Sequence, residues 1–392
     1  MVKTKSSCEK VRNHIPDDLI FTIISKSPLK SLGRYRCVRK SWSLLIQSPY
    51  FMNMYRINFA SNNYYSYVDH SCIIHELIEP YKLHGALFLY HGKQFENKVK
   101  LDWPPPIQED ARDFKFMGSV VDDTLCFSTW WKIPKIVFWN INTKEFKTLP
   151  PSFLESLQPS YQKVVCTIHG FGYDRVTNDH KLIRHVAHCL HVTDYEGFIP
   201  PHDSNWEVYS LRSDYWKKLD IDMPNGYSNT DLQVHTNGVC HWWDEPEYCL
   251  VSFDLRNDVF FRTPLPSCVD DNFDLLLVDK YFYALNGSVA FISTWETSSA
   301  NKLTTFHISI LAELGRKESW TKLFIVGPLP CIYRPIGAGN KGDIFFFSKD
   351  GELLQFDLIT QIIEKIDIQY QLGNKILLYK EVFLPVGALI NV

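Results

Sequence analysis

The first 50 residues carry apolar side chains at helical spacing. Residues 14–51 read HIPDDLIFTIISKSPLKSLGRYRCVRKSWSLLIQSPYF. Pro16 suits the first position of a helix, where its missing N–H costs nothing, and Asp17 and Asp18 place negative charge at the positive end of the helix dipole. The apolar stripe that follows consists of Leu19, Ile20, Ile23 and Ile24. Its spacing predicts one buried helix face, and the helix ends at Ser27-Pro28.

Two more short helices are predicted to follow. Pro28 opens the second, in which Leu29 and Leu32 face the same way and Gly33 costs about 1 kcal/mol relative to alanine. The third stops before Pro49, and its apolar positions are Val38, Trp42, Leu45 and Ile46. Helices of about ten residues are marginal in water, and a segment of roughly 40 residues buries too little apolar surface to stand alone. The stripes therefore pack either on the rest of the chain or on a partner protein, and the pattern leaves both open.

From about residue 60 the pattern changes to short aromatic and β-branched runs separated by Asn, Asp, Gly and Pro, which predicts strands. One unit of strand, tight polar turn and strand recurs as FWNINTKEFKTLPPS, VYSLRSDYWKKLDI, SFDLRNDVFFRTPLPS and QFDLITQIIEKIDI, with weaker copies at 88 and 306. The positions taken as equivalent are Leu89, Ile141, Leu211, Leu255, Ile308 and Leu358.

Self-similarity at a period of about 50 residues in a region of strands predicts a β-propeller, because each four-stranded blade buries its faces against neighbouring blades. Six copies indicate about six blades. The alternative is an irregular pair of β-sandwiches. The expected fold class is therefore a small α-helical domain followed by an all-β propeller-like domain.

Composition and charge narrow the class of protein. The chain has 392 residues, of which 45% are hydrophobic and 22% charged, values typical of globular proteins. There is no long apolar run and the first residues are polar, so neither a membrane span nor a signal peptide is expected. The ten cysteines are scattered singly, which favours reduced thiols and a location in the cytoplasm or the nucleus.

The charge is unevenly distributed along the chain. Residues 1–60 hold 11 Lys or Arg against 3 Asp or Glu, whereas the remainder holds 30 against 41. A basic segment of this kind favours an acidic partner, either nucleic acid or an acidic protein surface.

Sequence patterns that would indicate a catalytic, phosphate-binding or metal-binding site are weak. Residues 337–342 read GAGNKG, a literal GxGxxG, but an apolar strand follows and no helix N-terminus is available to hold a phosphate. The densest set of metal-ligand side chains is His185, His188, Cys189 and His191. On a strand His185 and His191 would lie roughly 20 Å apart, too far to hold one metal ion. No nucleophile or zinc-protease signature occurs, and we expect no catalytic site, no metal and no cofactor.

The segment 14–51 resembles the F-box, whose plant form runs approximately LPxDLxxxILxRLPxKSLxRFRCVxKSWxxLIxxPxF. The strongest matches are Lys30-Ser31-Leu32, Arg34 to Val38 and Lys40-Ser41-Trp42. The resemblance implies docking on the Skp-type adaptor of a cullin-RING ubiquitin ligase. Ile15, Ser27 and Gly33 depart from the family pattern, and the missing leucine at 27 removes about 1.5 to 3 kcal/mol of apolar contact if that position is buried.

The β region resembles the F-box-associated domain of plant F-box proteins, including those of the S-locus and kelch types. The blocks that carry the resemblance are GFGYDRVTNDHKLIRHV, NWEVYSLRSDYWKKL, NGVCHWW, SFDLRNDVFF and SWTKLF. It implies a module that recognises a target protein, which differs from member to member.

The hypothesis is a substrate-recognition subunit of a Skp-cullin-F-box ubiquitin ligase, itself non-catalytic, with an F-box domain at 1–60 (core 14–51) and an F-box-associated domain at 61–392. The residues expected to dock on the adaptor are Pro16, Leu19, Ile20, Ile24, Pro28, Leu32, Val38, Trp42, Leu45 and Ile46. The target itself is unknown, and candidate contacts are Trp130-Trp131 and residues 193–206.

Two alternatives come from other classes of protein. One is a nucleic-acid-binding regulator that uses the basic first 60 residues. The other is a propeller hydrolase with a central pocket lined by His and carboxylates.

Overall fold

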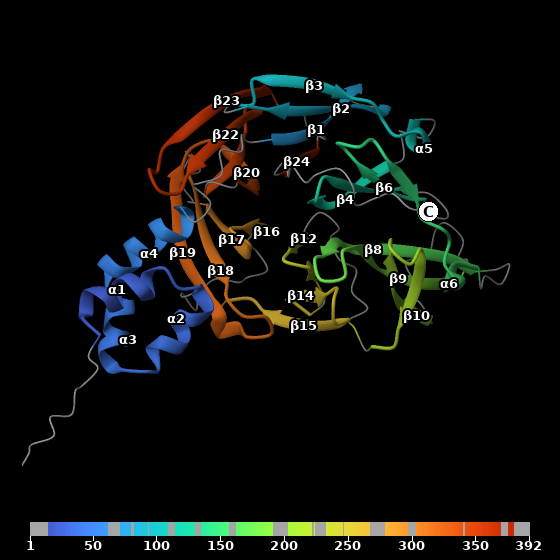
Figure 1. Cartoon of the computed structure of the whole chain (residues 1–392). Helices are drawn as coiled ribbons and strands as arrows, with labels where there is room; N and C mark the ends of the chain where they lie inside the picture. Colours follow the sequence, from blue (N-terminus) through green and yellow to red (C-terminus); the bar gives the residue numbers. More distant parts are fainter. Residues whose placement is uncertain are drawn as a thin grey trace, which may run out of the picture. The chain divides into compact units, whose positions relative to one another are not determined.

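The computed structural model describes residues 15–61, 71–79, 82–92, 94–108, 114–129, 135–156, 162–190, 203–221, 223, 233–245, 247–266, 279–296, 303–339, 342–369 and 375–379. The chain divides into two compact units, Met1–Ser61 and Asn62–Val392. The first consists of helices and the second is built from strands (Figure 1).

The helical unit contains α1 (Asp17–Ser25), α2 (Leu29–Arg36), α3 (Lys40–Gln47) and α4 (Pro49–Ser61). The three expected helices are confirmed, although α1 and α2 begin one residue after Pro16 and Pro28. The sequence interpretation missed α4 because it took Pro49 as a stop. Pro49 instead occupies the first position of a new helix, and the Ser48 hydroxyl accepts a hydrogen bond from the Phe51 N–H.

The second unit is a β-propeller of six four-stranded sheets. We number the blades by chain order and give their strands from the inner to the outer edge. Blade 1 is β24 (Lys375–Tyr379), β1 (Ser71–Glu79), β2 (Lys82–His91) and β3 (Asn97–Leu101). Blade 2 is β4 (Phe114–Val121), β5 (Thr124–Thr129), β6 (Ile136–Asn140) and β7 (Phe146–Thr148). Blade 3 is β8 (Gln162–Asp174), β9 (Asp179–Leu190), β10 (Asp203–Ser210) and β11 (Tyr215–Leu219).

The other three blades follow the same order. Blade 4 is β12 (Val234–Thr236), β13 (Val239–Asp244), β14 (Cys249–Asp254) and β15 (Val259–Pro264). Blade 5 is β16 (Lys280–Leu285), β17 (Ser288–Glu296), β18 (Thr304–Leu311) and β19 (Trp320–Leu329). Blade 6 is β20 (Ile332–Ala338), β21 (Asp343–Ser348), β22 (Glu352–Asp357) and β23 (Ile363–Gln369). Short helical turns at α5 (Pro105–Gln108), α6 (Phe153–Ser156) and η2 (Lys317–Ser319) lie between strands.

Blade 1 joins the two ends of the propeller. Its inner strand, β24, comes from the end of the chain and pairs antiparallel with β1, with Cys72 opposite Leu378 and Ile74 opposite Ile376. The ring is therefore closed by backbone hydrogen bonds between strands about 300 residues apart, a closure that protects the sheet edges that would otherwise be exposed.

The repeated sequence unit is the hairpin between the third and fourth strands of a blade. In blades 2, 3, 4 and 6 the third strand is followed by Ile141, Leu211, Leu255 and Leu358. The N–H of each of these residues donates to a backbone carbonyl next to the start of the second strand, at 2.9 to 3.1 Å. The last turn residue has a positive φ in every case, at Lys144, Asp214, Asp258 and Gln361. A polar turn residue is thus required three positions after each apolar one.

Two of the six positions that the sequence analysis took as equivalent, Leu89 and Ile308, do not occupy the turn position that the other four share. Leu89 lies inside β2 and Ile308 lies inside β18, whereas the corresponding turn positions follow His91 and Leu311. In blade 1 the turn position after His91 is Gly92 and the positive-φ residue three positions on is Phe95, so the apolar and polar residues of the tight hairpin are absent. Blade 5 has a longer turn, from 312 to 319.

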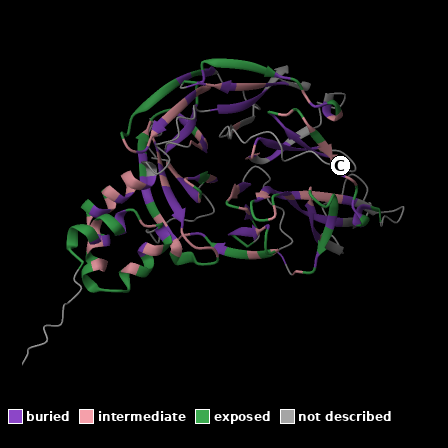
Figure 2. Cartoon of the chain, viewed as in Figure 1, coloured by how far each residue is buried: buried purple, intermediate pink, exposed green. Residues whose placement is uncertain are grey.

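The core lies between blades. Blades 2 and 3 share a cluster that includes Phe138, Phe171 and Trp216, and blades 3 and 4 share one that includes Trp206, Trp242 and Phe253. Figure 2 shows buried stretches on the strands of the propeller. Each blade is therefore held by apolar packing against its neighbours.

Two glycines of β8 allow blades 3 and 4 to approach closely. A Cβ at Gly170 would lie 2.4 Å from the Cβ of Cys240, and one at Gly172 would lie 2.4 Å from the His235 ring. Residues 170–172, the GFG that opens the block GFGYDRVTNDHKLIRHV, thus have a packing role, because side chains at the two glycine positions would force the two blades apart.

We expect Gly170→Ala to lower the free energy of unfolding of the propeller by about 1 to 3 kcal/mol, because the new methyl group would overlap Cys240. Denaturant unfolding followed by tryptophan fluorescence measures this. Gly33→Ala is the control, because nothing lies within 4 Å of the Cβ it would add. A Gly170→Ala protein as stable as the parent would contradict the packing role.

Candidate functional sites: an exposed helical ridge and a pocket between two blades

Helix α1 carries an exposed aliphatic ridge. Leu19 and Ile23 lie four residues apart on α1 and share one face, and Ile15 lies just before the helix; the exposed fractions of Ile15, Leu19 and Ile23 are 50%, 50% and 56%. Val38, Leu44 and Tyr50 add further exposed apolar side chains in the same unit. Figure 2 shows extended exposed stretches on α1, α2 and α3. A small helical unit with this much uncovered apolar surface has the properties of a docking surface.

The residues expected to dock on an adaptor fall into three groups. Pro16, Leu19, Pro28 and Val38 are exposed. Trp42 and Leu45 are half-buried. Ile20, Ile24, Leu32 and Ile46 are buried. The residues that the sequence interpretation did not expect to dock are Ile15, Ile23, Leu44 and Tyr50. The four-residue spacing of Leu19 and Ile23 was a signal that could have found Ile23.

Helix α4 supplies much of the cover for the buried stripe. Phe51 and Tyr55 are almost fully buried, and the Phe51 ring lies edge-on to Phe21 of α1 at 5.5 Å. The Tyr55 hydroxyl donates to the Ser27 carbonyl and the Asn58 amide donates to the Ser25 carbonyl, both at 3.2 Å. The stripe of Ile20 and Ile24 is therefore buried. The ridge of Ile15, Leu19 and Ile23 remains exposed.

Trp42 has a structural role as well as partial exposure. Its ring lies perpendicular to that of Tyr35 on α2, with centroids 5.7 Å apart. The contact joins α2 to α3, so a change at Trp42 affects the packing of the helices in addition to any surface they present.

Basic side chains lie close to Val38 in the sequence. Arg34, Arg36, Arg39 and Lys40 are exposed on α2, on α3 and between them, next to Val38. The helical surface therefore combines apolar contact with positive charge, an arrangement complementary to an acidic protein surface.

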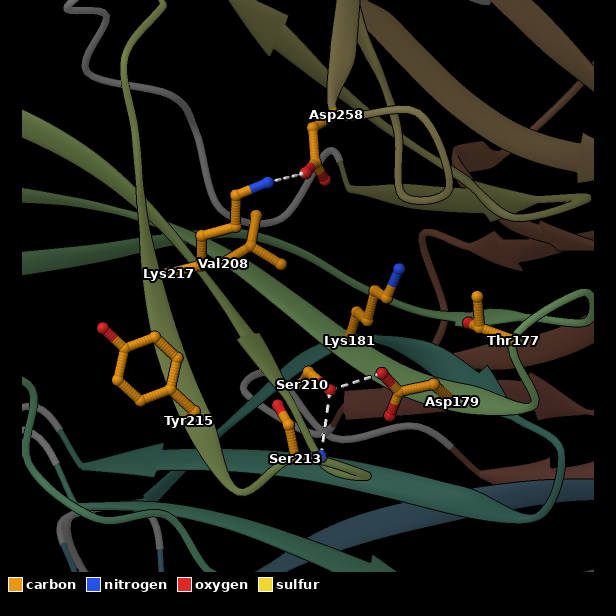
Figure 3. Close-up of a pocket in the computed structure, with 9 residues that line it drawn as sticks. All are labelled: Thr177, Asp179, Lys181, Val208, Ser210, Ser213, Tyr215, Lys217 and Asp258. Carbon is orange, nitrogen blue, oxygen red and sulfur yellow. Dashed lines mark hydrogen bonds and ion pairs between the residues drawn. The ribbon is translucent and has the colours of Figure 1, made fainter.

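The propeller has an open pocket of about 360 Å³ where blade 3 meets blade 4. Figure 3 shows its lining, which is Thr177, Asp179, Lys181, Val208, Ser210, Ser213, Tyr215, Lys217 and Asp258. We call it the seam pocket. Lys217 of β11 reaches across it to Asp258 of the next blade at 2.6 Å (Figure 3).

The polar groups of the seam pocket are held by specific partners. The Lys181 ammonium donates to the Leu255 carbonyl at 2.6 Å and to Asp174 at 3.2 Å. Asp179 accepts hydrogen bonds from the Ser210 hydroxyl at 2.6 Å and from the Arg212 N–H at 2.8 Å. These bonds fix the walls, whereas Val208 gives the pocket an apolar surface.

Several expected sites lie outside the described residues. These are Trp130-Trp131, most of the 193–206 segment, His191, and the side chains of His188 and Cys189. His185 is described, and its ring lies 5.1 Å from that of Trp206. Among the residues that the structure describes, no group of His, Cys, Asp or Glu is arranged to hold a metal ion.

The GxGxxG sequence forms part of a β-hairpin, because Gly337 lies in β20 and β21 begins directly after Gly342. This confirms the interpretation that no helix follows it. Within the described part of the chain, no helix is both long and apolar enough to cross a membrane.

Comparison with known proteins identifies the family. Residues 79–381 match the family described as the F-box associated beta propeller domain. The chain belongs to this family. An F-box/kelch-repeat protein of Arabidopsis thaliana is 22% identical over 344 residues, covering 83% of this chain and 82% of the relative. Another Arabidopsis thaliana protein with the F-box name is 22% identical over 387 residues, covering 95% of this chain and 89% of the relative.

With the F-box motif of its helical unit, the chain is a plant F-box protein with an F-box-associated propeller. Among solved structures, TolB from Acinetobacter baumannii is similar at a TM-score of 0.46 and 9% identity, covering 84% of this chain and 73% of that one. This likeness is too distant to bear on function.

The blocks typical of the F-box-associated domain include a buried ionic cluster. Arg184 on β9 is only 1% exposed; its Nη1 lies 2.5 Å from Glu155 and its Nε donates to Glu207 at 2.7 Å. The guanidinium carbon lies 3.6 Å from the centroid of the Trp216 ring. The cluster ties α6, in the connection between blades 2 and 3, to blade 3. It holds the propeller together, and removing one partner from such a buried pair is strongly destabilising.

Buried histidines are a second feature of the F-box-associated domain. Burial lowers the pKa of His185 to about 4 and that of His241 to about 3, and it lowers the pKa of His169 well below its usual value. The two ring nitrogens of His241 lie 2.8 Å from the hydroxyls of Thr236 and Ser252. These rings are therefore neutral parts of the core.

The propeller should lose stability in mild acid. Above about pH 6.5 these histidines are neutral in both the folded and the unfolded chain. Between about pH 6.5 and pH 4 only the unfolded chain binds protons at these positions, so the free energy of unfolding falls by about 1.4 kcal/mol per pH unit for each histidine. Denaturant unfolding at pH 7, 6 and 5 measures the slope. His241→Gln should reduce that slope, and an unfolding free energy that stays constant from pH 7 to 5 would contradict this assignment.

Proposed function

We propose that this chain is the substrate-recognition subunit of a Skp-cullin-F-box ubiquitin ligase. Residues 1–60 act as the F-box domain and dock on a Skp-type adaptor, while residues 61–392 hold a target protein. The observation that carries the proposal is the uncovered aliphatic ridge of Ile15, Leu19 and Ile23, which lies within a sequence that matches the F-box.

The exposed and buried groups have different parts in docking. Leu19, Val38, Pro16 and Pro28, together with Ile15, Ile23 and Leu44, touch the adaptor directly. Ile20, Ile24, Leu32 and Ile46 hold the four helices in the arrangement that presents this surface. The exposed arginines beside Val38 would speed association with an acidic adaptor surface and make it dependent on salt.

The chain itself performs no bond-making step in this proposal. Its contribution is proximity, because a target lysine held near a ubiquitin-charged enzyme reacts as if within one molecule. The site of action would be the cytoplasm, the nucleus or both, where such ligases work on intracellular targets.

Leu19→Asp should weaken adaptor binding by at least about tenfold, because a carboxylate in an apolar contact must lose its water without a partner. Co-purification of the full chain with a Skp-type adaptor, followed by a binding titration, measures this. Leu19 is half exposed, so the helices should keep their thermal stability. Trp42→Asp would be a poorer test because it also removes the contact with Tyr35.

Asn53→Asp on α4 is the matched control, because it places the same carboxylate at an exposed position on another helix. It should bind the adaptor as the parent does. If Leu19→Asp and Ile23→Asp both retain full adaptor binding, the docking assignment is wrong.

A further inference from the structure

The repetition of the propeller permits two neighbouring seams to be compared position by position. In blade 2, Phe138 pairs with Lys147 across β6 and β7, and in blade 3, Val208 pairs with Lys217 across β10 and β11. Each lysine bonds to the aspartate that ends the hairpin turn of the following blade, Asp214 or Asp258, at 2.6 Å in both cases. The two seams are therefore built on the same plan.

The seam between blades 2 and 3 is filled by aromatic rings. The ring of Tyr209 lies 6.0 Å from that of Phe138, and both belong to the apolar cluster shared by these blades. The Tyr209 hydroxyl donates to Asp214 Oδ1 at 2.6 Å, while Lys147 occupies Oδ2. Both carboxylate oxygens of Asp214 therefore have a hydrogen-bond donor. The donor to Oδ1 is the phenol of Tyr209 and the donor to Oδ2 is the ammonium group of Lys147.

The seam between blades 3 and 4 lacks two of these groups. Val208 stands where blade 2 has Phe138, which removes an aromatic ring, and Phe253 stands where blade 3 has Tyr209, which removes a phenolic hydroxyl. The seam pocket of about 360 Å³ lies at this seam, where both Val208 and Asp258 line it. Asp258 Oδ2 bonds to Lys217, and Oδ1 has no hydrogen-bond donor among the residues that the structure describes.

We propose that the seam pocket binds an aromatic ring that carries a hydroxyl group. The ring packs on Val208 in the volume that Phe138 fills one blade earlier, and its hydroxyl donates to Asp258 Oδ1 as Tyr209 does to Asp214. The pocket volume lies in the range usual for ligand sites.

The charges of the pocket disfavour other ligands. A cationic group would meet the ammonium groups of Lys181 and Lys217, and an anionic group would compete with Asp258 for Lys217. A neutral hydrogen-bond donor avoids both penalties and satisfies the open oxygen of Asp258.

A phenolic ring could be supplied by a tyrosine of a bound protein or by a free phenolic compound. The first source rests on the proposed function, because it makes the seam pocket part of the target-binding surface. Binding by the pocket itself can be tested without the adaptor, so its failure is distinguishable from failure of adaptor docking.

The test is ligand-observed NMR titration of the full chain with four probes: N-acetyltyrosinamide, N-acetylphenylalaninamide, p-cresol and toluene. We expect saturable binding of a phenolic probe that is about three- to tenfold tighter than that of its counterpart without the hydroxyl. Binding of N-acetyltyrosinamide and p-cresol supports a tyrosine as the source. Binding of p-cresol alone supports a free phenolic compound.

Val208→Phe should weaken phenol binding at least tenfold, because it refills the pocket as blade 2 is filled. Val259→Phe is the matched control, since it makes the same change at an exposed position outside the pocket. Phe253→Tyr should remove the preference for the hydroxylated probe, because its own hydroxyl would reach Asp258. Adaptor binding by these variants should be unchanged.

The proposal is overturned if neither phenolic probe binds the folded chain, or if Val208→Phe and Phe253→Tyr both leave binding and preference unaltered. Loss of adaptor binding by Leu19→Asp would not affect either result.

Discussion

A four-stranded blade has two apolar faces, and each face must be covered by another blade. This single constraint explains the architecture of the propeller. The larger core clusters each draw on two adjacent sheets, as Trp206 of blade 3 and Trp242 of blade 4 illustrate. A ring is the arrangement in which every blade has a neighbour on both sides, and the pairing of β24 with β1 completes it.

Because the seams carry the packing, polar groups placed there must be satisfied locally. Arg184 is balanced by two glutamates, and His241 lies between two hydroxyls. Gly170 and Gly172 have no side chains, so β8 can approach Cys240 and His235 of blade 4 closely. The blocks typical of the F-box-associated domain thus contain seam residues as well as turn residues.

The repeating hairpin was predictable because its turn requires a residue with positive φ at a fixed distance from a buried aliphatic residue. Blade 1 has Gly92 and Phe95 at these two positions and blade 5 has a longer turn, and in both the spacing gave the wrong register. Helix α4 was missed because a proline can end one helix or begin the next, and the choice depends on the Ser48 cap.

The candidate sites were less predictable than the fold. Leu19 and Ile20 are adjacent on one stripe in the sequence, yet Ile20 is buried and Leu19 is half exposed, because α4 covers only part of α1. The seam pocket has no sequence signature of its own. The difference that marks this seam, Val208 and Phe253 in place of Phe138 and Tyr209, becomes visible once the blades are aligned by their strand register.

The position of β24 in the chain has a consequence for biosynthesis. A ribosome makes β1 early and β24 some 300 residues later, so the inner edge of the first blade stays unpaired during nearly all of translation. Blades 2 to 6 are complete within their own stretches of chain and can form in the order of their synthesis, whereas blade 1 must wait. Nascent chains interrupted before residue 375 would present the bare edge of β1 to the proteostasis machinery, which links completion of the ring to surveillance of unfinished chains.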